Sequence, residues 1–369
     1  MAVRIPRVAS RPSGALLPLL TLALHGCLSD GLTTLPDEDL GIVCSVPESS
    51  FAFGSIRDAI PALTNPEMAS VDSPGTLTWT SDDRVVGFVL DGQAFAIPLN
   101  IFWHHEIVNF DHQGHAVAIT HCPLTGSSLG FDRRPYGSVE FGVSGFLFEN
   151  NLVMYDRIGA SESLWPQMVR GARCGSKDGS SLDAVPVVEM TWRGWRDLYP
   201  QTLVVTTNTG WDREYASSGN PYSIYQSEDN PDLLFPLSEG LDGRRPPKER
   251  GLGVPVGNGG VVFPFGILEQ EGDLAAIHEM AGPDEFVLFW DRWYQAAMAY
   301  TPSIDGQALT FQVVGDQILD VETGSEWLVT GMAVSGPHAG RKLEPVAEAF
   351  VAFWFAWPAF LPDVEIWSP

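Results

Sequence analysis

The sequence predicts a mainly β (α+β) fold made of two tandem, related β-rich copies with short capping helices. Three observations predict it. Gly and Pro are frequent, with 37 and 28 residues, and both interrupt long helices. Short apolar runs of strand length recur between turn residues. The same order of Gly, Pro and Trp residues occurs twice, which predicts one copy at residues 51–225 and a second at residues 226–369.

The first 26 residues have the pattern of a bacterial lipoprotein signal peptide. Three arginines precede an apolar run that ends in Leu24-His25-Gly26-Cys27. Cleavage before Cys27 would leave this cysteine to carry the lipid, and residues 27–50, rich in Pro, Asp, Glu and Ser, would form a tether. We therefore expect an exported protein that is lipid-anchored to the cell envelope and touches the membrane only through its lipid.

Two alternatives to lipidation stay open. The signal can be an ordinary secretory one that is cleaved nearby, or it can remain as a membrane anchor. The apolar run Ala15–Leu24 is shorter than the roughly 20 residues that a helix needs to cross a bilayer, which disfavours the second alternative.

Within the first copy the clearest β signal is a hairpin. Residues 84–90 and 93–98 are apolar runs of strand length, and Asp91-Gly92 between them favours a two-residue hairpin turn. Further strands are expected at residues 116–120, 138–143 and 152–155.

Two short helices are expected. Residues 191–198 place two tryptophans and Leu198 on one helical face, and Pro200 ends the segment. The apolar run 351–361 is expected to form a buried helix near the C-terminus.

The internal repeat joins five groups of residues in an unbroken order. Val86-Gly87 with Ala96–Leu99 matches Leu252-Gly253 with Val262–Phe265, Gly137–Phe141 matches Gly306–Phe311, Asp156–Trp165 matches Asp320–Trp327, Gly171, Gly179 and Leu182 match Gly331, Gly340 and Leu343, and Trp192, Trp195 and Pro200 match Trp354, Trp357 and Pro362.

Charge and motifs exclude several classes of protein. The formal net charge of −25 opposes binding to nucleic-acid phosphates, so no nucleic-acid partner is expected. The sequence has neither a phosphate-binding loop nor a dinucleotide fingerprint, so no nucleotide cofactor is expected. His105-Glu106-Ile107-Val108-Asn109 fails the zinc-protease pattern, because Asn109 stands at the second His position.

Five of the eight histidines lie between His104 and His121, next to Cys122. Imidazole and thiolate bind transition metals, and a thiolate favours the softer ions. A hairpin would bring His105 beside Cys122. We therefore predict a copper-like site built from His105, Glu106, His121 and Cys122. The matching part of the second copy, residues 269–291, has no Cys and only His278, which indicates that the framework does not need these groups.

Two other functions stay open, and the sequence leaves undecided whether the protein is an enzyme. In one, Cys122 is a catalytic nucleophile or redox thiol whose pKa a nearby histidine lowers. In the other, the chain is a non-catalytic interaction or scaffold module. His112 and His115 are expected to lie in a solvated polar turn, and Cys122 can also be a small buried hydrophobe.

The chain has four cysteines, and lipid on Cys27 would leave three. Export permits disulfides. We predict a disulfide between Cys44 and Cys174, because Cys122 is the cysteine set among histidines.

From about residue 55 to its end, the chain resembles the bacterial and archaeal domain-of-unknown-function family 3179 (DUF3179). The matching motifs include His105-Glu106-Ile107-Val108-Asn109, Cys122-Pro123-Leu124-Thr125-Gly126-Ser127, Phe141-Gly142-Val143-Ser144-Gly145-Phe146 and Leu152-Val153-Met154-Tyr155-Asp156-Arg157. The resemblance implies no established activity.

The chain departs from the family pattern at three positions. Thr125 replaces a second cysteine, His104 stands where the family usually has Trp, and His121 stands where it usually has Tyr. A local dithiol redox cycle is therefore not expected.

Overall fold

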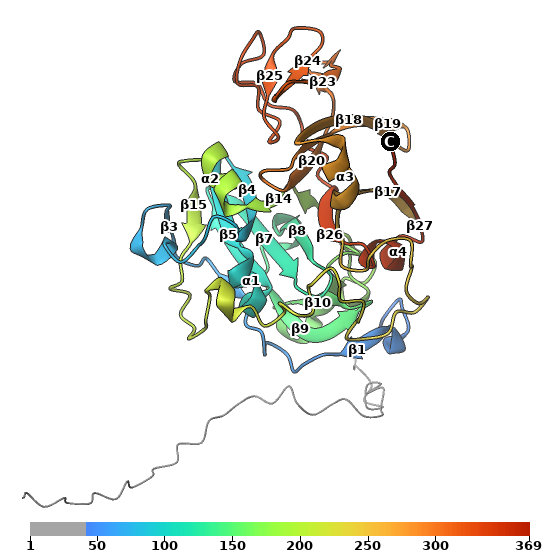
Figure 1. Cartoon of the computed structure of the whole chain (residues 1–369). Coiled ribbons are helices and arrows are strands. Elements are labelled where there is room, and N and C mark those ends of the chain that lie inside the picture. The colour runs from blue at the N-terminus through green and yellow to red at the C-terminus, as the bar shows by residue number, and fades with distance from the viewer. Residues whose placement is uncertain (1–41) are drawn as a thin grey trace, which may run out of the picture. The chain divides into compact units, whose positions relative to one another are not determined.

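The computed structural model describes residues 42–369. The expected signal peptide at 1–26, Cys27, and residues 27–41 of the expected tether lie outside this range. The described chain is built of many short strands and four short α-helices, so the predicted mainly β class is confirmed (Figure 1). We call residues 51–225 the first half and residues 226–369 the second half.

The first half contains three five-stranded sheets. One has the order β14-β4-β5-β15-β3, and the predicted hairpin is its β4 and β5, joined at Asp91-Gly92. The strands of this sheet are β3 (Met68–Ser70), β4 (Arg84–Leu90), β5 (Gln93–Pro98), β14 (Val188–Thr191) and β15 (Leu203–Val205).

The second sheet has the order β13-β8-β7-β6-β2 and carries the His and Cys residues. Its strands are β2 (Leu63–Thr64), β6 (Ile107–His112), β7 (His115–Cys122), β8 (Ser127–Asp132) and β13 (Ala184–Val185). The third sheet consists of β1 (Phe51–Phe53), β9 (Phe141–Phe148), β10 (Asn151–Asp156), β11 (Ser163–Pro166) and β12 (Cys174–Gly175), in the order β1-β9-β10-β11-β12.

The second half has smaller sheets. A four-stranded sheet has the order β26-β16-β17-β27, from β16 (Arg250–Val256), β17 (Gly259–Pro264), β26 (Phe350–Phe353) and β27 (Asp363–Ile366). The remaining strands are β18 (Leu274–Ala281), β19 (Asp284–Asp291), β20 (Ala296–Tyr300), β21 (Ser303–Ile304), β22 (Gln307–Ala308), β23 (Phe311–Val314), β24 (Gln317–Asp320) and β25 (Glu326–Trp327).

Each α-helix comes directly or shortly after a strand in the chain. They are α1 (Leu99–His105), α2 (Trp192–Leu198), α3 (Phe265–Glu271) and α4 (Ala356–Phe360). The capping helix expected at 191–198 is confirmed as α2, with Thr191 as its N-cap. The single helix expected at 351–361 is wrong, because β26 takes the first part of that run and α4 the second. An apolar run with no polar face has no period that separates strand from helix.

The two halves share part of their strand topology. In both, a strand pairs antiparallel on each side (β14-β4-β5 and β26-β16-β17), and a further strand joins parallel (β15 and β27). In both, a helix follows β5 or β17 in the chain and leads into three consecutive antiparallel strands, α1 into β6–β8 and α3 into β18–β20.

Matching side chains fill matching places in the halves. A Cβ at Gly87 would overlap the Trp195 ring, and one at Gly253 would overlap the Trp357 ring. Only glycine fits at these two positions, because an indole ring packs directly against each strand. Likewise, Trp165 Nε1 donates to Asp156 and Trp327 Nε1 donates to Asp320, at 3.2 and 2.9 Å.

The halves are joined by reciprocal contacts. β14 of the first half lies beside β20, and β26 of the second half lies beside β8 (Figure 1). Thr191 N donates to Tyr294 O at 2.9 Å, and Phe353 N donates to Thr125 O at 2.8 Å. Each half thus supplies a backbone donor to the hairpin turn of the other.

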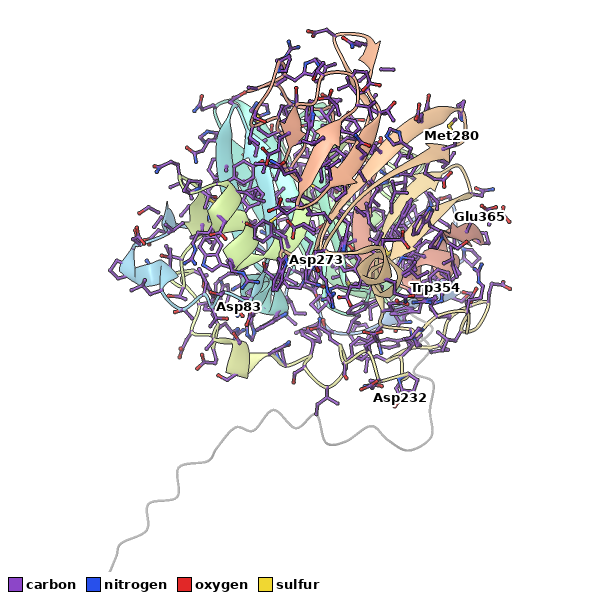
Figure 2. All side chains as sticks on the ribbon, turned by 45° about the horizontal axis from the view of Figure 1, so that its top comes forward. Asp83, Asp232, Asp273, Met280, Trp354 and Glu365 are labelled. Carbon is purple, nitrogen blue, oxygen red and sulfur yellow. A yellow bond between two sulfur atoms is a disulfide. The ribbon has the colours of Figure 1, made fainter. Side chains whose placement is uncertain are left out.

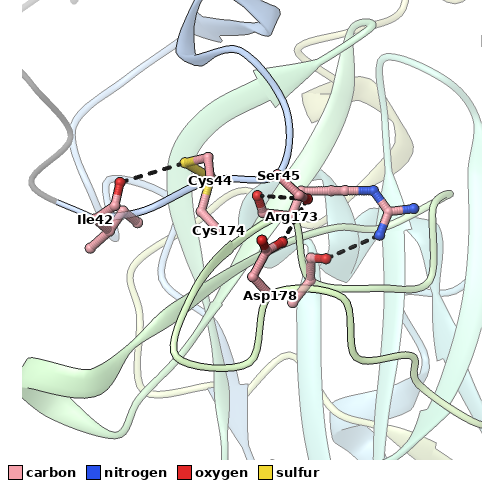
Figure 3. Close-up of a disulfide and its surroundings, with 7 residues drawn as sticks. Ile42, Cys44, Ser45, Arg173, Cys174 and Asp178 are labelled. Atoms are coloured by element: carbon pink, nitrogen blue, oxygen red, sulfur yellow. Dashed lines mark hydrogen bonds between the residues drawn. A yellow bond between two sulfur atoms is a disulfide. The ribbon is translucent and has the colours of Figure 1, made fainter.

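A disulfide joins Cys44 to Cys174, the pair expected from the sequence (Figure 3). Next to it, Ser45 N donates to Arg173 O at 2.9 Å, and Ser45 Oγ donates to Asp178 at 2.7 Å. Residues 44 and 45 of the expected tether are therefore held against β12 rather than extended away from it.

Candidate functional site

Cys122 is the last residue of β7 and the free cysteine of residues 42–369. Its side chain is 1% exposed and packs among apolar residues. Leu152 N donates to its Sγ at 3.3 Å, and the thiol donates weakly to Asn150 O at 3.7 Å. The sulfur is thus oriented by the backbone of β10 and of the turn before it.

Glu106 directly follows α1 and has an unusual backbone conformation. Its φ is 55°, in the region that L-residues rarely adopt. Its N donates to Phe102 O, and its O accepts from His121 N. In a regular ladder, a residue opposite His121 would share that histidine's face. The carboxyl instead lies close enough to Cys122 and Tyr222 for its charge to raise the pKa of both.

Burial keeps this acid and this thiol neutral. It raises the pKa of the Glu106 carboxyl to about 8. Burial first, and the charge of Glu106 second, raise the pKa of Cys122 to about 11. Both groups therefore hold their protons at pH 7, so Cys122 is not a thiolate in this structure at that pH.

The second half has a glycine directly after its helix. Gly272 follows α3 as Glu106 follows α1, but φ and ψ are 136° and −171° at Gly272 and 55° and −32° at Glu106. One residue separates α1 from β6, whereas two residues separate α3 from β18. A side chain at positive φ costs about 1 kcal/mol relative to glycine. The two turns are therefore built differently, and only the turn of the first half has a non-glycine residue at positive φ.

A buried network of neutral side chains fixes the turn after Cys122. Thr125 Oγ1 and Ser127 Oγ lie 2.8 Å apart, and Asn151 Nδ2 donates to both. Ser127 Oγ donates to Gln167 Oε1 at 2.6 Å, and Gln167 Nε2 donates to Thr120 Oγ1 at 2.8 Å. Thr125 acts to lower the pKa of Cys122, against the effect of burial, so a hydroxyl stands where the resembling family has a second thiol.

His105 does not face Cys122. The predicted hairpin exists as β6 and β7, but His105 belongs to α1. Its Nδ1 lies 2.8 Å from Pro61 O, and its Nε2 lies 2.6 Å from the Tyr215 hydroxyl. Burial lowers the pKa of this imidazole to about 4. Both ring nitrogens have partners in the packed structure.

His121 points away from Cys122 because neighbouring residues of a strand face opposite sides. Its Nδ1 is 2.9 Å from Ser128 Oγ, which donates to Glu189 at 2.8 Å. Glu189 also pairs with Arg84 and Arg250, one from each half. Burial lowers the pKa of His121 to about 4.

The structure therefore does not bring His105, Glu106, His121 and Cys122 together. Glu106 is near enough to raise the pKa of Cys122, whereas both imidazoles face elsewhere. Over residues 42–369 no three His, Cys, Asp or Glu side chains are grouped as metal ligands would be. His121 and Cys122 diverge because they are neighbours in β7, and His105 lies in α1, outside the hairpin.

The other three histidines of the cluster have structural partners. His115 Nε2 is 3.1 Å from Asp91, and His104 Nε2 is 3.1 Å from Glu214 O. The His112 ring stacks on Phe110. His112 and His115 flank the turn as expected, but they are half-buried rather than fully solvated.

A long segment that the sequence reasoning missed covers the turn after Cys122. Residues 206–249 connect β15 to β16 and contain one short 3-10 helix, η5 (Ser217–Gly219). Gln226 Nε2 donates to Pro123 O at 2.9 Å, and the Tyr225 hydroxyl donates to Leu124 O at 3.0 Å. We call residues 206–249 the cover. Its length and tyrosines were visible in the sequence, but its place was not.

Within residues 42–369, no helix has both the length and the apolar character to span a bilayer. No curated protein and no solved structure matches the chain. The family model described as "Protein of unknown function (DUF3179)" matches residues 57–364, which include Glu106, Cys122 and the cover. The chain therefore belongs to the DUF3179 family.

Proposed function

We propose that the protein carries out thiol-dependent chemistry, with Cys122 as nucleophile and Glu106 as its proton acceptor. One observation carries the proposal. Glu106 occupies a strained backbone position, and its buried carboxyl is near enough to the thiol for its charge to raise the pKa of Cys122. Strained residues gather at functional sites. An acid retained at such a position is explained by what its side chain does.

The reaction assigned to the pair is a displacement at an acyl carbon. The ionised Glu106 carboxylate takes the proton from the Cys122 thiol while the sulfur bonds to that carbon. The bond to the leaving group breaks, and the leaving group receives the proton from Glu106. Glu106 then takes a proton from water, the water oxygen bonds to the acyl carbon, the C–S bond breaks, and the Cys122 sulfur receives the proton from Glu106.

Access to the pair requires movement of the cover. The structure has Cys122 buried and both groups neutral, which is a silent state. Displacement of Tyr225 and Gln226 would admit water and substrate. Hydration lowers the pKa values of both the carboxyl and the thiol toward their ordinary values. Long irregular segments in compact domains often serve as such lids.

We also propose that the chain is exported and lipid-anchored through Cys27. The N-terminal sequence supports this, and so does the Cys44–Cys174 disulfide, because disulfides persist in oxidising compartments. We infer further that the two halves arose by tandem duplication, which their common strand order supports. Of the two halves related by this duplication, only the first has the Cys122 thiol.

Binding of a copper-like ion is the second candidate function. It is favoured by the nearness of Glu106 and Cys122, which are two of the four predicted ligands. A scaffold role without chemistry is the third, and it gives no reason for the strain at Glu106.

Alkylation of Cys122 by iodoacetamide across pH, with the modified peptide identified by mass spectrometry, tests the proposal. In the parent chain we expect the rate to rise as Glu106 ionises, near pH 8. Glu106→Gln should lose this step and keep only the rise of the thiolate at higher pH. Glu365→Gln, which removes an exposed carboxyl, is the control. A Glu106→Gln profile equal to that of the parent, or faster throughout, would contradict the proposal.

A further inference from the structure

A cavity of about 680 Å³ lies between the two halves. Its walls come from the residues just before and at the start of β4, from the start of α2, from the end of α3 with Asp273, and from the turn between β19 and β20. Asp273 lies where the ribbons of the two halves meet (Figure 2). The volume is within the range of small-molecule sites in proteins.

This cavity is the open counterpart of the covered Cys122 turn. The turn between β19 and β20 has the place in the second half that residues 123–126 have in the first. Leu124, the second residue of the first-half turn, is 7% exposed under the cover. Trp293, the second residue of the turn between β19 and β20, is 65% exposed. An indole this exposed at the mouth of a cavity presents a large apolar surface to solvent.

The charges that line the cavity are balanced. Three are guanidinium groups and three are carboxylates: Arg84, Arg193 and Arg292, with Asp82, Glu269 and Asp273. Each guanidinium has five N–H donors. Arg193 uses one of them on Trp293 O at 3.0 Å, and the nearest approach of Arg292 to Asp273 is 3.7 Å. Arg84 is already bonded to Glu189 and to Gln295 O. Donors of Arg193 and Arg292, with the carboxylate acceptors, therefore remain for a ligand.

We infer that the cavity binds a neutral saccharide. An anion would meet three carboxylates and a cation would meet three guanidinium groups, so neither charge sign is favoured. A pyranose ring has hydroxyls that both donate and accept, which suits planar carboxylates and guanidinium groups in equal number. Its C–H faces are apolar and pack flat on an indole such as Trp293. The site needs neither Cys122 nor the cover.

Calorimetry on the intact chain with maltotriose, cellotriose and tri-N-acetylchitotriose tests the inference. We expect at least one of these to bind, and Trp293→Ala to weaken its affinity by about tenfold or more. Trp211→Ala is the matched control, because Trp211 is also exposed, at 48%, and lies outside the cavity. The affinity of Trp211→Ala for the saccharide should equal that of the parent chain.

Circular dichroism checks that each variant is folded. Both tryptophans are exposed, so neither substitution should disturb the core. Binding of none of the three saccharides at millimolar concentration overturns the inference. So does equal binding by Trp293→Ala and Trp211→Ala. Binding of the zwitterionic dipeptide diglycine in place of the saccharides also overturns it, because it assigns the balanced charges to a charged ligand.

Discussion

Glu106 and Gly272 each follow the helix of their half at positive φ, 55° and 136°, but their ψ angles are −32° and −171°. The turn after the helix is thus built differently in the two halves, and only the first half places a side chain at positive φ there. Glycine adopts positive φ without strain. A glycine at position 106 would therefore relieve strain that the Glu106 side chain causes.

Replacement of Glu106 by glycine should stabilise the protein and remove its reactivity. Glu106→Gly relieves the backbone strain and takes away a buried acid, so we expect a gain of about 1 kcal/mol in the free energy of unfolding in urea at pH 7. Alkylation of Cys122 should lose its step near pH 8. Gly272→Ala is the control and should destabilise. A loss of stability in Glu106→Gly would show that the carboxyl is structural.

Stability should fall as pH rises because of Glu106. Its pKa is about 8 in the folded chain, above the ordinary value of 4.5. The folded state therefore binds the proton more tightly than the unfolded state does. This contribution is fully present below pH 4.5 and is lost as pH rises to about 8.

Glu106→Gln should remove that pH dependence. The difference in unfolding free energy between variant and parent should change by on the order of 2 kcal/mol between pH 5 and pH 8, in favour of the variant at the higher pH. Urea titrations at the two pH values measure it. A constant difference would mean that the Glu106 carboxyl is not buried as described.

Loosening the cover should speed alkylation of Cys122. Gln226→Ala removes the hydrogen bond to Pro123 O, which contributes about 1 kcal/mol. The population of the open form should therefore rise about fivefold, and the alkylation rate with it. Ser238→Ala is the control within the cover, because the Ser238 hydroxyl that it removes donates to Glu149 and not to the turn after Cys122. Equal rates in the two variants would argue against opening at residues 222–226.

Any soft metal that the protein binds should depend on Cys122 and Glu106 and not on His121. His121 faces Ser128 and Glu189, on the other side of the strand. We expect copper retained after exposure to Cu(I) and dialysis to be lost in Cys122→Ala and unchanged in His121→Ala. Loss of copper in both Cys122→Ala and His121→Ala would instead support the ligand set predicted from the sequence.

The sequence predicted the local elements well. The β4–β5 hairpin follows from Asp91-Gly92 between two apolar runs, and α2 follows from the spacing of its tryptophans. Both are set by interactions within a few residues. The pairing of Cys44 with Cys174 was reached from the surroundings of Cys122, without any knowledge of distance.

The site was predicted only in part. Cys122 and Glu106 were singled out, but the opposite directions of His121 and Cys122 follow from strand alternation and were overlooked. The positive φ at Glu106 had no local signal, because Glu is not a residue that favours it. The contacts of Tyr225 and Gln226 join positions about a hundred residues apart, which no local pattern specifies.

The reciprocal bonds from Thr191 to Tyr294 and from Phe353 to Thr125 have a consequence for the integrity of the chain. Separation of the halves would leave each hairpin turn without the donor that its neighbour provides. Melting should accordingly proceed as a single cooperative transition, and the first half expressed by itself should not keep an ordered turn after Cys122.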